Sequence, residues 1–189
     1  PAYPPKSPRQ TRPIPLDTLG ATIARGFDRL GWHWWPSDSA IATQDHEGRA
    51  ACINAGTCLL GCAQGAKAST DITYWPLAIR AGVELRTRCR VREITTDEHG
   101  MASGVVYYDA KGEEHFQPAE VVIVACNGVG TPRLLLNSRS PLFPDPLANR
   151  SGLVGKRLMF HGYGTVWGVF AQPLDSFRGP QANIVLSHE

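Results

Sequence analysis

Three cysteines lie close together in the sequence, at Cys52, Cys58 and Cys62. Three thiolates within one short loop could ligate an iron–sulfur cluster or, together with a histidine such as His46, a zinc ion. The spacing lacks the C-x-x-C pair that makes such sites recognisable, and unpaired cysteines are common small core residues. The cysteine spacing therefore favours a structural role and leaves a metal site as the alternative.

A second stretch that could do chemistry is the glycine-rich turn at 127–130, which follows the apolar run 121–125. The threonine and proline at 131–132 favour the N-cap and the first position of a helix. A helix that begins after glycines presents free N–H groups, which suit a phosphate or the polar edge of a cofactor. The turn is not a dinucleotide fingerprint, because Arg133 stands where G-x-G-x-x-G requires its third glycine. Cofactor contact and a plain turn are equally compatible with this spacing.

The apolar pattern predicts the helices and strands that would position these residues. Apolar residues at helical spacing indicate a helix between an N-cap at Asp17 and a stop at Gly31. A second helix is expected from residue 69 or 70 to Ala81. Strand-like runs occur at 83–87, 91–95, 102–108, 114–117, 121–125 and, more weakly, 163–170, with a hairpin turn signal at 109–112. Because the run 121–125 is apolar throughout, it predicts a strand covered on both faces, as in the parallel sheet of an α/β fold.

Composition excludes some classes of function. The 189 residues carry 19 basic and 17 acidic side chains, a net charge of +2, so charge does not favour a nucleic-acid partner. Arginines at 86, 88, 90 and 92 alternate along the chain, but without interleaved aromatic residues they indicate a solvated face. The longest apolar run, at 121–126, is far shorter than the ~20 residues of a transmembrane helix. We therefore expect neither a nucleic-acid site nor a transmembrane segment.

Several motifs occur together in an order that resembles the GMC (glucose–methanol–choline) flavoprotein oxidoreductases. They include the cysteine-containing Gly-Cys-Ala-Gln-Gly-Ala segment and the Gly-Thr-Pro-Arg-Leu-Leu-Leu segment. The matching stretches are 61–70, 73–76, 82–85, 91–94, 104–107, 121–125, 130–136 and 151–161. The turn at 127–132 is similar to that of the bacterial gluconate and sugar dehydrogenase branch. A generic family pattern would have Gly-Ala at positions 127 and 128.

The resemblance implies a mixed α/β fold made of part of an FAD-binding domain and the start of an antiparallel-sheet substrate domain. In this division, 1–50 is a proline-rich segment with a helix and a loop. Residues 51–162 belong to the FAD-binding domain, without the N-terminal GxGxxG unit of the family, and 163–189 begin the substrate domain. We therefore interpret the chain as an internal fragment of a longer polypeptide.

The resemblance also implies FAD as a cofactor and assigns residues to it. These residues are Val91 at the adenine end, and Asn127, Gly128, Gly130, Thr131 and Pro132 beside the flavin. No catalytic residue is expected in this chain, because the family's histidine and its partner histidine or asparagine belong to a later segment. Some bacterial members carry an iron–sulfur cluster at a loop similar to that of Cys52, Cys58 and Cys62. These three cysteines are therefore candidate cluster ligands.

The implied function is oxidation of a CH–OH group of a small alcohol or sugar, with hydride transfer to flavin. A dehydrogenase that uses an external electron acceptor is favoured over an oxidase, and the fragment alone is expected to be inactive. Two alternatives remain: a truncated, non-catalytic module, and a metal-binding structural module built on the three cysteines.

Overall fold

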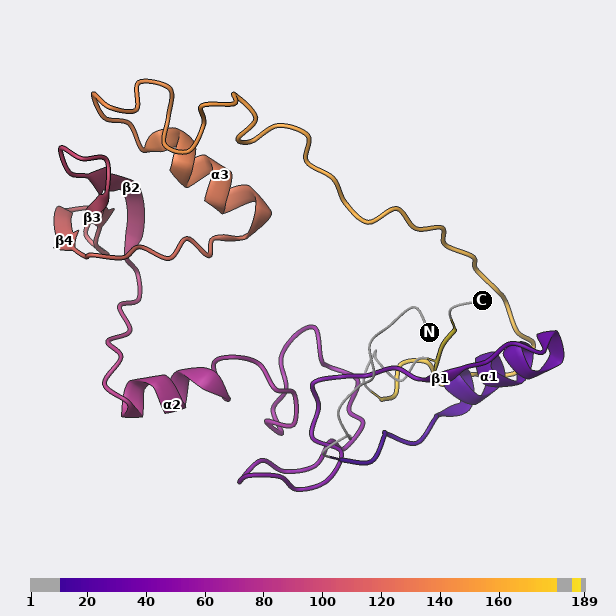
Figure 1. Cartoon of the computed structure of the whole chain (residues 1–189). Helices are drawn as coiled ribbons and strands as arrows, with labels where there is room; N and C mark the ends of the chain where they lie inside the picture. The colour runs from indigo at the N-terminus through magenta and orange to yellow at the C-terminus, as the bar shows by residue number, and fades with distance from the viewer. Residues whose placement is uncertain (1–10, 180–184, 188–189) are drawn as a thin grey trace. The chain divides into compact units, whose positions relative to one another are not determined.

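The computed structural model describes residues 11–179 and 185–187 (Figure 1). These residues form two compact units. The first unit contains 11–83 with 166–179 and 185–187, and the second contains 84–165. The first ten residues of the predicted proline-rich segment lie outside the described residues.

Helix α1, Thr18–Leu30, belongs to the first unit and confirms the prediction from its apolar spacing. The Asp17 side chain accepts a hydrogen bond of 2.9 Å from the N–H of Gly20, which satisfies a free donor of the first turn. The helix ends at Gly31, whose φ of 71° is in the left-handed region that glycine adopts without a steric penalty. Both ends of α1 are therefore determined by local sequence.

The rest of the first unit contains little regular structure. Strand β1, Trp35–Pro36, pairs antiparallel with β5, Val185–Leu186. Helix α2, Tyr74–Arg80, starts later than predicted, because residues 69–73 form turns instead. The Ser69 carbonyl accepts N–H groups from both Ile72 and Thr73 in these turns.

An antiparallel three-stranded sheet with the order β2-β3-β4 forms the second unit. Its strands are β2, Arg90–Thr96, β3, Ala102–Tyr108, and β4, Glu114–Pro118. They confirm the strands predicted at 91–95, 102–108 and 114–117. Asp109 closes the predicted turn between β3 and β4, because its Oδ1 accepts the N–H groups of Lys111 and Glu113 at 2.8 and 3.0 Å.

The strands predicted at 83–87, 121–125 and 163–170 do not form in the described structure. The sheets among residues 11–179 and 185–187 are antiparallel, so the predicted parallel sheet is absent from this part of the chain. Apolar side chains favour a strand, but a strand exists only where a neighbour accepts its backbone hydrogen bonds. Among the described residues, none of these three segments has a strand neighbour.

Helix α3, Asn127–Asn137, begins earlier than predicted. Thr131 is not its N-cap and Pro132 is not at its first position, because the glycine-rich turn is itself helical and the proline lies inside the helix. The side chain of Asn127 closes the first turn instead. Its Oδ1 accepts the N–H groups of Val129 and Gly130 at 2.8 and 3.1 Å. Asn127, with a φ of 62°, thus binds the free N–H groups of the first turn that Thr131 was predicted to bind.

Both units bury few side chains among the described residues. Ala24, Ala42, Ala66 and Val185 are buried in the first unit, and Ile94, Val106 and Ser138 in the second. In the part of the chain that the structure describes, no helix has the length and apolar character needed to cross a bilayer. The architecture is a mixture of helices and antiparallel sheet, consistent with the predicted mixed α/β class.

Candidate functional site

The start of α3 exposes backbone groups that a ligand could reach. Gly128 and Val129 are exposed, and a Cβ added at Gly128 would have no heavy atom within 4 Å. The N–H groups of Asn127 and Gly128 have no acceptor among the described residues, whereas those of Val129 and Gly130 bind the Asn127 side chain. Two free donors at the positive end of a helix fit an electron-rich edge such as a flavin carbonyl or a phosphate.

Thr131 and Pro132 support this turn from within the helix. The Thr131 hydroxyl accepts the N–H of Cys126 at 3.2 Å, which fixes the chain that enters α3. Pro132 has no N–H, so the carbonyl oxygen of Gly128 keeps its acceptor capacity. Gly130 is in a tighter place than Gly128, because an added Cβ would lie 3.0 Å from the Cβ of Cys126. The predicted residues of the turn therefore form one continuous local structure.

Val91 lies on β2, which is an edge strand of its sheet. Its partner in the pairing is Tyr107 on β3, and no other strand of the described residues pairs with β2. An edge strand leaves N–H and C=O groups open to a ligand. Recognition of an adenine ring by the Val91 backbone is therefore compatible with this geometry.

Ser138 joins the two elements that carry the predicted cofactor residues. It follows α3 directly and is 1% exposed. Its hydroxyl oxygen accepts the N–H of Ile94 on β2 at 2.9 Å, and its O–H donates to the Leu134 carbonyl at 2.7 Å. The structure thus attaches α3 to β2 through one buried hydroxyl group. Ser138 was not predicted as a functional residue, because no sequence signal distinguishes it from a surface serine.

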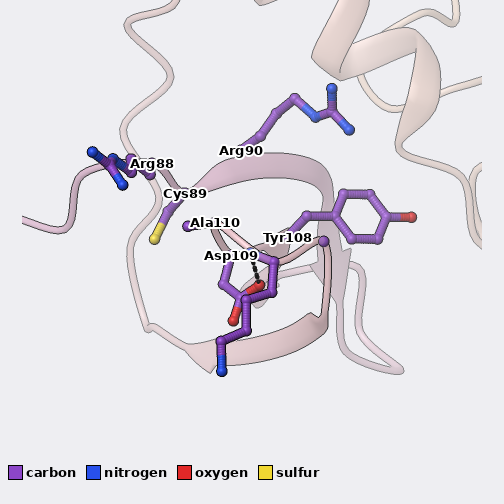
Figure 2. A pocket seen from close by; sticks show the side chains of 8 residues that line it. Arg88, Cys89, Arg90, Tyr108, Asp109 and Ala110 are labelled. Carbon is purple, nitrogen blue, oxygen red and sulfur yellow. Dashed lines mark hydrogen bonds between the residues drawn. The ribbon is translucent and has the colours of Figure 1, made fainter.

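A hollow of about 580 Å³ lies between the start of β2 and the turn that follows β3 (Figure 2). Arg88, Cys89, Arg90, Tyr108, Asp109 and Lys111 are among the residues that line it. The guanidinium carbon of Arg90 lies 5.7 Å from the centre of the Tyr108 ring. In Figure 2 the side chains of Arg88 and Arg90 point away from each other, so they do not converge on a common ligand position.

The other two arginines of the alternating series bind carboxylates. Arg86 contacts Glu84 at 2.7 Å, and Arg92 contacts Glu93 and Glu114, each at 2.6 Å. The hydrogen bond to Arg86 lowers the pKa of Glu84. The Glu84–Arg86 pair is exposed, as the alternation predicted, and exposed ion pairs contribute little to stability. The Arg92–Glu93 pair is partly buried, and Arg92 Nε is buried without a hydrogen-bond partner among the described residues, so the predicted solvated face includes Arg92 only in part.

The three cysteines are half-buried in the first unit and are not in disulfide bonds. The loop is closed by backbone hydrogen bonds from Cys52 to Ala42 and from Ala42 to Ala66, and by Lys67 Nζ, which donates to the Cys58 carbonyl at 2.8 Å. The N–H of Lys67, with those of three preceding residues, lowers the pKa of Cys62 against the opposing effect of burial. The three sulfur atoms do not all lie within 4.8 Å of one another, so in the described structure they are not grouped as the ligands of one metal site would be. The geometry therefore gives no support to the predicted cluster.

In one group of potential metal ligands among the described residues, all the ligand atoms do lie within 4.8 Å of one another. It contains Asp109, Glu113 and His115, at the turn between β3 and β4. His115 stacks on Tyr107 and its Nε2 lies 3.2 Å from Asp109 Oδ2. The pattern Asp-x3-Glu-x-His is visible in the sequence, but this group was not predicted. All three side chains are at least partly exposed, and their contacts are accounted for by closure of the hairpin.

The hairpin gives a pH-dependent prediction. The Glu113 N–H donates to Asp109, and together with His115 and the Lys111 N–H it lowers the pKa of that carboxyl, while desolvation opposes the change. The folded pKa therefore lies below the ordinary value of about 3.9. The stability that Asp109 contributes is present above that value and is lost as the pH falls through the folded pKa.

We expect the backbone amide resonance of Lys111 to shift in an NMR titration with a midpoint below about 3.9. The Asp109→Asn variant should show no such transition, because its amide does not titrate. A midpoint above about 4.5 in the unsubstituted chain would contradict the assigned hydrogen bonds.

The sequence was also compared with known proteins. The profile of the GMC oxidoreductase family matches residues 14–162. The chain is 42% identical over 94% of its length to 2-methyl-1,2-propanediol dehydrogenase of Mycolicibacterium austroafricanum, covering 32% of that protein. It is 37% identical over 69% of its length to 6'''-hydroxyparomomycin C oxidase of Streptomyces lividus, covering 24%. It is 27% identical over 84% of its length to the gluconate 2-dehydrogenase flavoprotein of Pantoea cypripedii, covering 27%.

These matches have two consequences. The chain spans about a third or less of the length of these relatives. The family match covers most of the chain and includes β2, the Asn127–Pro132 turn and α3, which confirms the resemblance seen in the motifs. The chain belongs to the GMC oxidoreductase family, a family of FAD-binding oxidoreductases.

Proposed function

We propose that the chain is part of an FAD-dependent oxidoreductase that oxidises a CH–OH group of a small alcohol or sugar. The observation that carries this proposal is the exposed start of α3, which lies within the family match and presents two free N–H groups beside a glycine that has open space around it. When bound, FAD would supply the hydride acceptor. This chain would contribute binding and orientation of the cofactor.

In this proposal, Asn127, Gly128, Gly130, Thr131 and Pro132 form the support beside the flavin. Gly128 allows close approach of the ligand to the backbone, and the Asn127 side chain holds the turn in shape. Val91 offers its backbone to the adenine end from the open edge of β2. The base that removes the alcohol proton would come from another segment of the polypeptide.

The substrate and acceptor are also proposed by similarity. The relatives include a diol dehydrogenase and an aminoglycoside oxidase, which supports a small polar substrate with hydroxyl groups. We favour a dehydrogenase with an external electron acceptor, because the relative at 42% identity is named a dehydrogenase. Re-oxidation of the reduced enzyme by an artificial acceptor but not by O₂ would support this choice.

We also propose that residues 51–162 are part of the FAD-binding domain and that 163–189 begin the substrate domain. Residues 180–184 and 188–189 of the latter lie outside the described residues. The iron–sulfur cluster at Cys52, Cys58 and Cys62 stays a prediction from the family resemblance. Iron and acid-labile sulfide in the purified full-length protein, lost in a Cys58→Ser variant, would support it.

The Gly128→Ala variant tests the proposed flavin site in the full-length protein that contains these residues. The new methyl group meets no heavy atom within 4 Å, and alanine is favoured over glycine in a helix by about 1 kcal/mol. We therefore expect unchanged or slightly increased stability and at least tenfold weaker flavin binding, because the methyl group occupies the space left for the ligand. Flavin content and fluorescence titration of the apoprotein provide the measurement.

Gly26→Ala is the matched control. Gly26 lies in α1, and its added Cβ also meets no heavy atom within 4 Å. This variant should gain helix stability and keep full flavin affinity. Equal flavin affinity in the Gly128→Ala and Gly26→Ala variants would show that the start of α3 is not part of the flavin site. A full-length protein that binds no flavin at all would overturn the proposed function.

A further inference from the structure

Asn127 is followed directly by Gly128, and no other Asn–Gly pair occurs in the sequence. Both residues are exposed at the start of α3. In such a pair, the backbone nitrogen of the glycine can attack the side-chain carbonyl carbon of the asparagine and close a cyclic succinimide. Glycine favours this step, because it has no Cβ to hinder the approach or to restrict rotation of the backbone.

The nitrogen of Gly128 is available for this attack. Its N–H has no acceptor among the described residues, and a Cβ added at this residue would meet no heavy atom within 4 Å. In the interior of a helix, by contrast, each N–H donates to the carbonyl of the preceding turn, and that bond would have to break first. Ring closure requires rotation about the Cα–C bond of Asn127, and this rotation breaks no hydrogen bond of the Gly128 N–H.

The carbon that would be attacked is polarised by two donors. Asn127 Oδ1 accepts the N–H groups of Val129 and Gly130 at 2.8 and 3.1 Å. Attack at Cγ places negative charge on this oxygen, and N–H donors at such distances stabilise an oxyanion. The Nδ2 group of Asn127, which would leave, makes no hydrogen bond within the described part of the chain. The contacts that close the first turn of α3 therefore also favour this reaction.

We propose that Asn127 is a site of spontaneous deamidation in the folded protein. The Gly128 nitrogen loses its proton and forms a bond to Asn127 Cγ, the Cγ–Nδ2 bond breaks, and the side-chain nitrogen takes up a proton and leaves as ammonia. Water then opens the succinimide at either of its carbonyl groups, which gives aspartate or isoaspartate at position 127. No group is oxidised or reduced, and water is the only co-reactant.

Both products would change the start of α3. Either one places a carboxylate where the amide stood, and isoaspartate also inserts a methylene group into the main chain. The effect on the cofactor rests on the proposed function: a negative charge at this place would repel an electron-rich edge of the flavin, so flavin affinity would fall as the protein ages. The deamidation itself does not require flavin and therefore goes beyond the proposed function.

Mass spectrometry of peptides from the full-length protein, incubated with and without flavin, tests the inference. We expect the peptide that contains Asn127 to gain the mass of an amide-to-acid conversion with time, and to do so faster as the pH rises, because the attacking nitrogen must lose its proton. Enzymatic methylation identifies isoaspartate in the product. Bound flavin should slow the reaction about tenfold, because a ligand at the start of α3 favours the closed turn over its open forms.

Asn54 is the internal control. It is also exposed and has a positive φ, of 57°, but Ala55 follows it, and its side-chain oxygen accepts from the Cys52 thiol instead of from backbone N–H groups. It should remain an asparagine over the same period. The Gly128→Ala variant is the second control and should slow the reaction at Asn127 about tenfold, because the methyl group hinders the attacking nitrogen.

Three results would overturn the inference. They are an unchanged Asn127 in the flavin-free full-length protein over a period in which a synthetic peptide of residues 124–132 deamidates, equal rates at Asn54 and Asn127, and an undiminished rate in the Gly128→Ala variant. Deamidation at the same rate with and without flavin would instead contradict the proposed position of the flavin and leave this inference intact.

Discussion

Gly104→Ala is expected to destabilise the unit formed by 84–165 by about 2–5 kcal/mol, as the sum of overpacking and backbone strain. Gly104 lies in the central strand β3, opposite Thr95 on one side and Pro118 on the other. Its φ is 154°, a conformation that other residues rarely adopt. An added Cβ would collide with the Gln117 carbonyl oxygen and would lie 2.8 Å from the Phe116 ring. The Phe116 ring is 56% exposed and can rotate away, but the Gln117 carbonyl belongs to the backbone of β4 and cannot move without opening the β3–β4 pair.

Gly112→Ala separates the two contributions. Gly112 also has a positive φ, of 84°, but an added Cβ there meets no heavy atom within 4 Å. This control should cost only the backbone strain, about 1–2 kcal/mol. Urea unfolding of the two variants measures the difference in the free energy of unfolding. Equal losses would show that the contacts across β3 and β4 do not limit the size of residue 104.

Ser138→Ala is expected to reduce the stability of the same unit by about 1–3 kcal/mol, the usual cost of a buried group left without its partner. The substitution removes the acceptor of the Ile94 N–H at a position that is 1% exposed. It also removes the bond from the serine hydroxyl to the Leu134 carbonyl, which lies on α3. Since this hydroxyl attaches α3 to β2, the full-length protein should lose flavin affinity together with stability.

Ser151→Ala is the matched control for this prediction. Ser151 is exposed and its hydroxyl accepts a single bond of 3.3 Å from the Leu153 N–H. Its loss should change the free energy of unfolding by less than about 0.5 kcal/mol. Denaturant unfolding and flavin titration of both variants give the comparison. A Ser138→Ala variant as stable as the Ser151→Ala variant would show that the buried hydroxyl does not hold α3 to the sheet.

Several features of the structure depend only on residues that are close together in the sequence. Helix α1, the hairpin turn at Asp109 and the strands β2, β3 and β4 were predicted correctly, because each depends on residues close together in the chain. Family membership was also readable from the motifs, since it depends on the order of residue types. The residues of the proposed flavin site were likewise identified from the motifs alone, and their role stays a prediction.

Other features depended on partners that local sequence does not identify. The run 121–125 has the composition of a buried strand, yet it forms none here, because a strand needs a neighbour for its hydrogen bonds. Helix α3 begins one turn earlier than predicted, so the side chain of Asn127, and not that of Thr131, binds the free N–H groups of its first turn. Ser138 is buried and binds the N–H of Ile94 because the end of α3 lies against β2, a contact between segments that are far apart in the sequence. The sequence by itself determined the local elements and the family, and the tertiary structure decided which of their polar groups found partners, because those contacts join residues far apart in the chain.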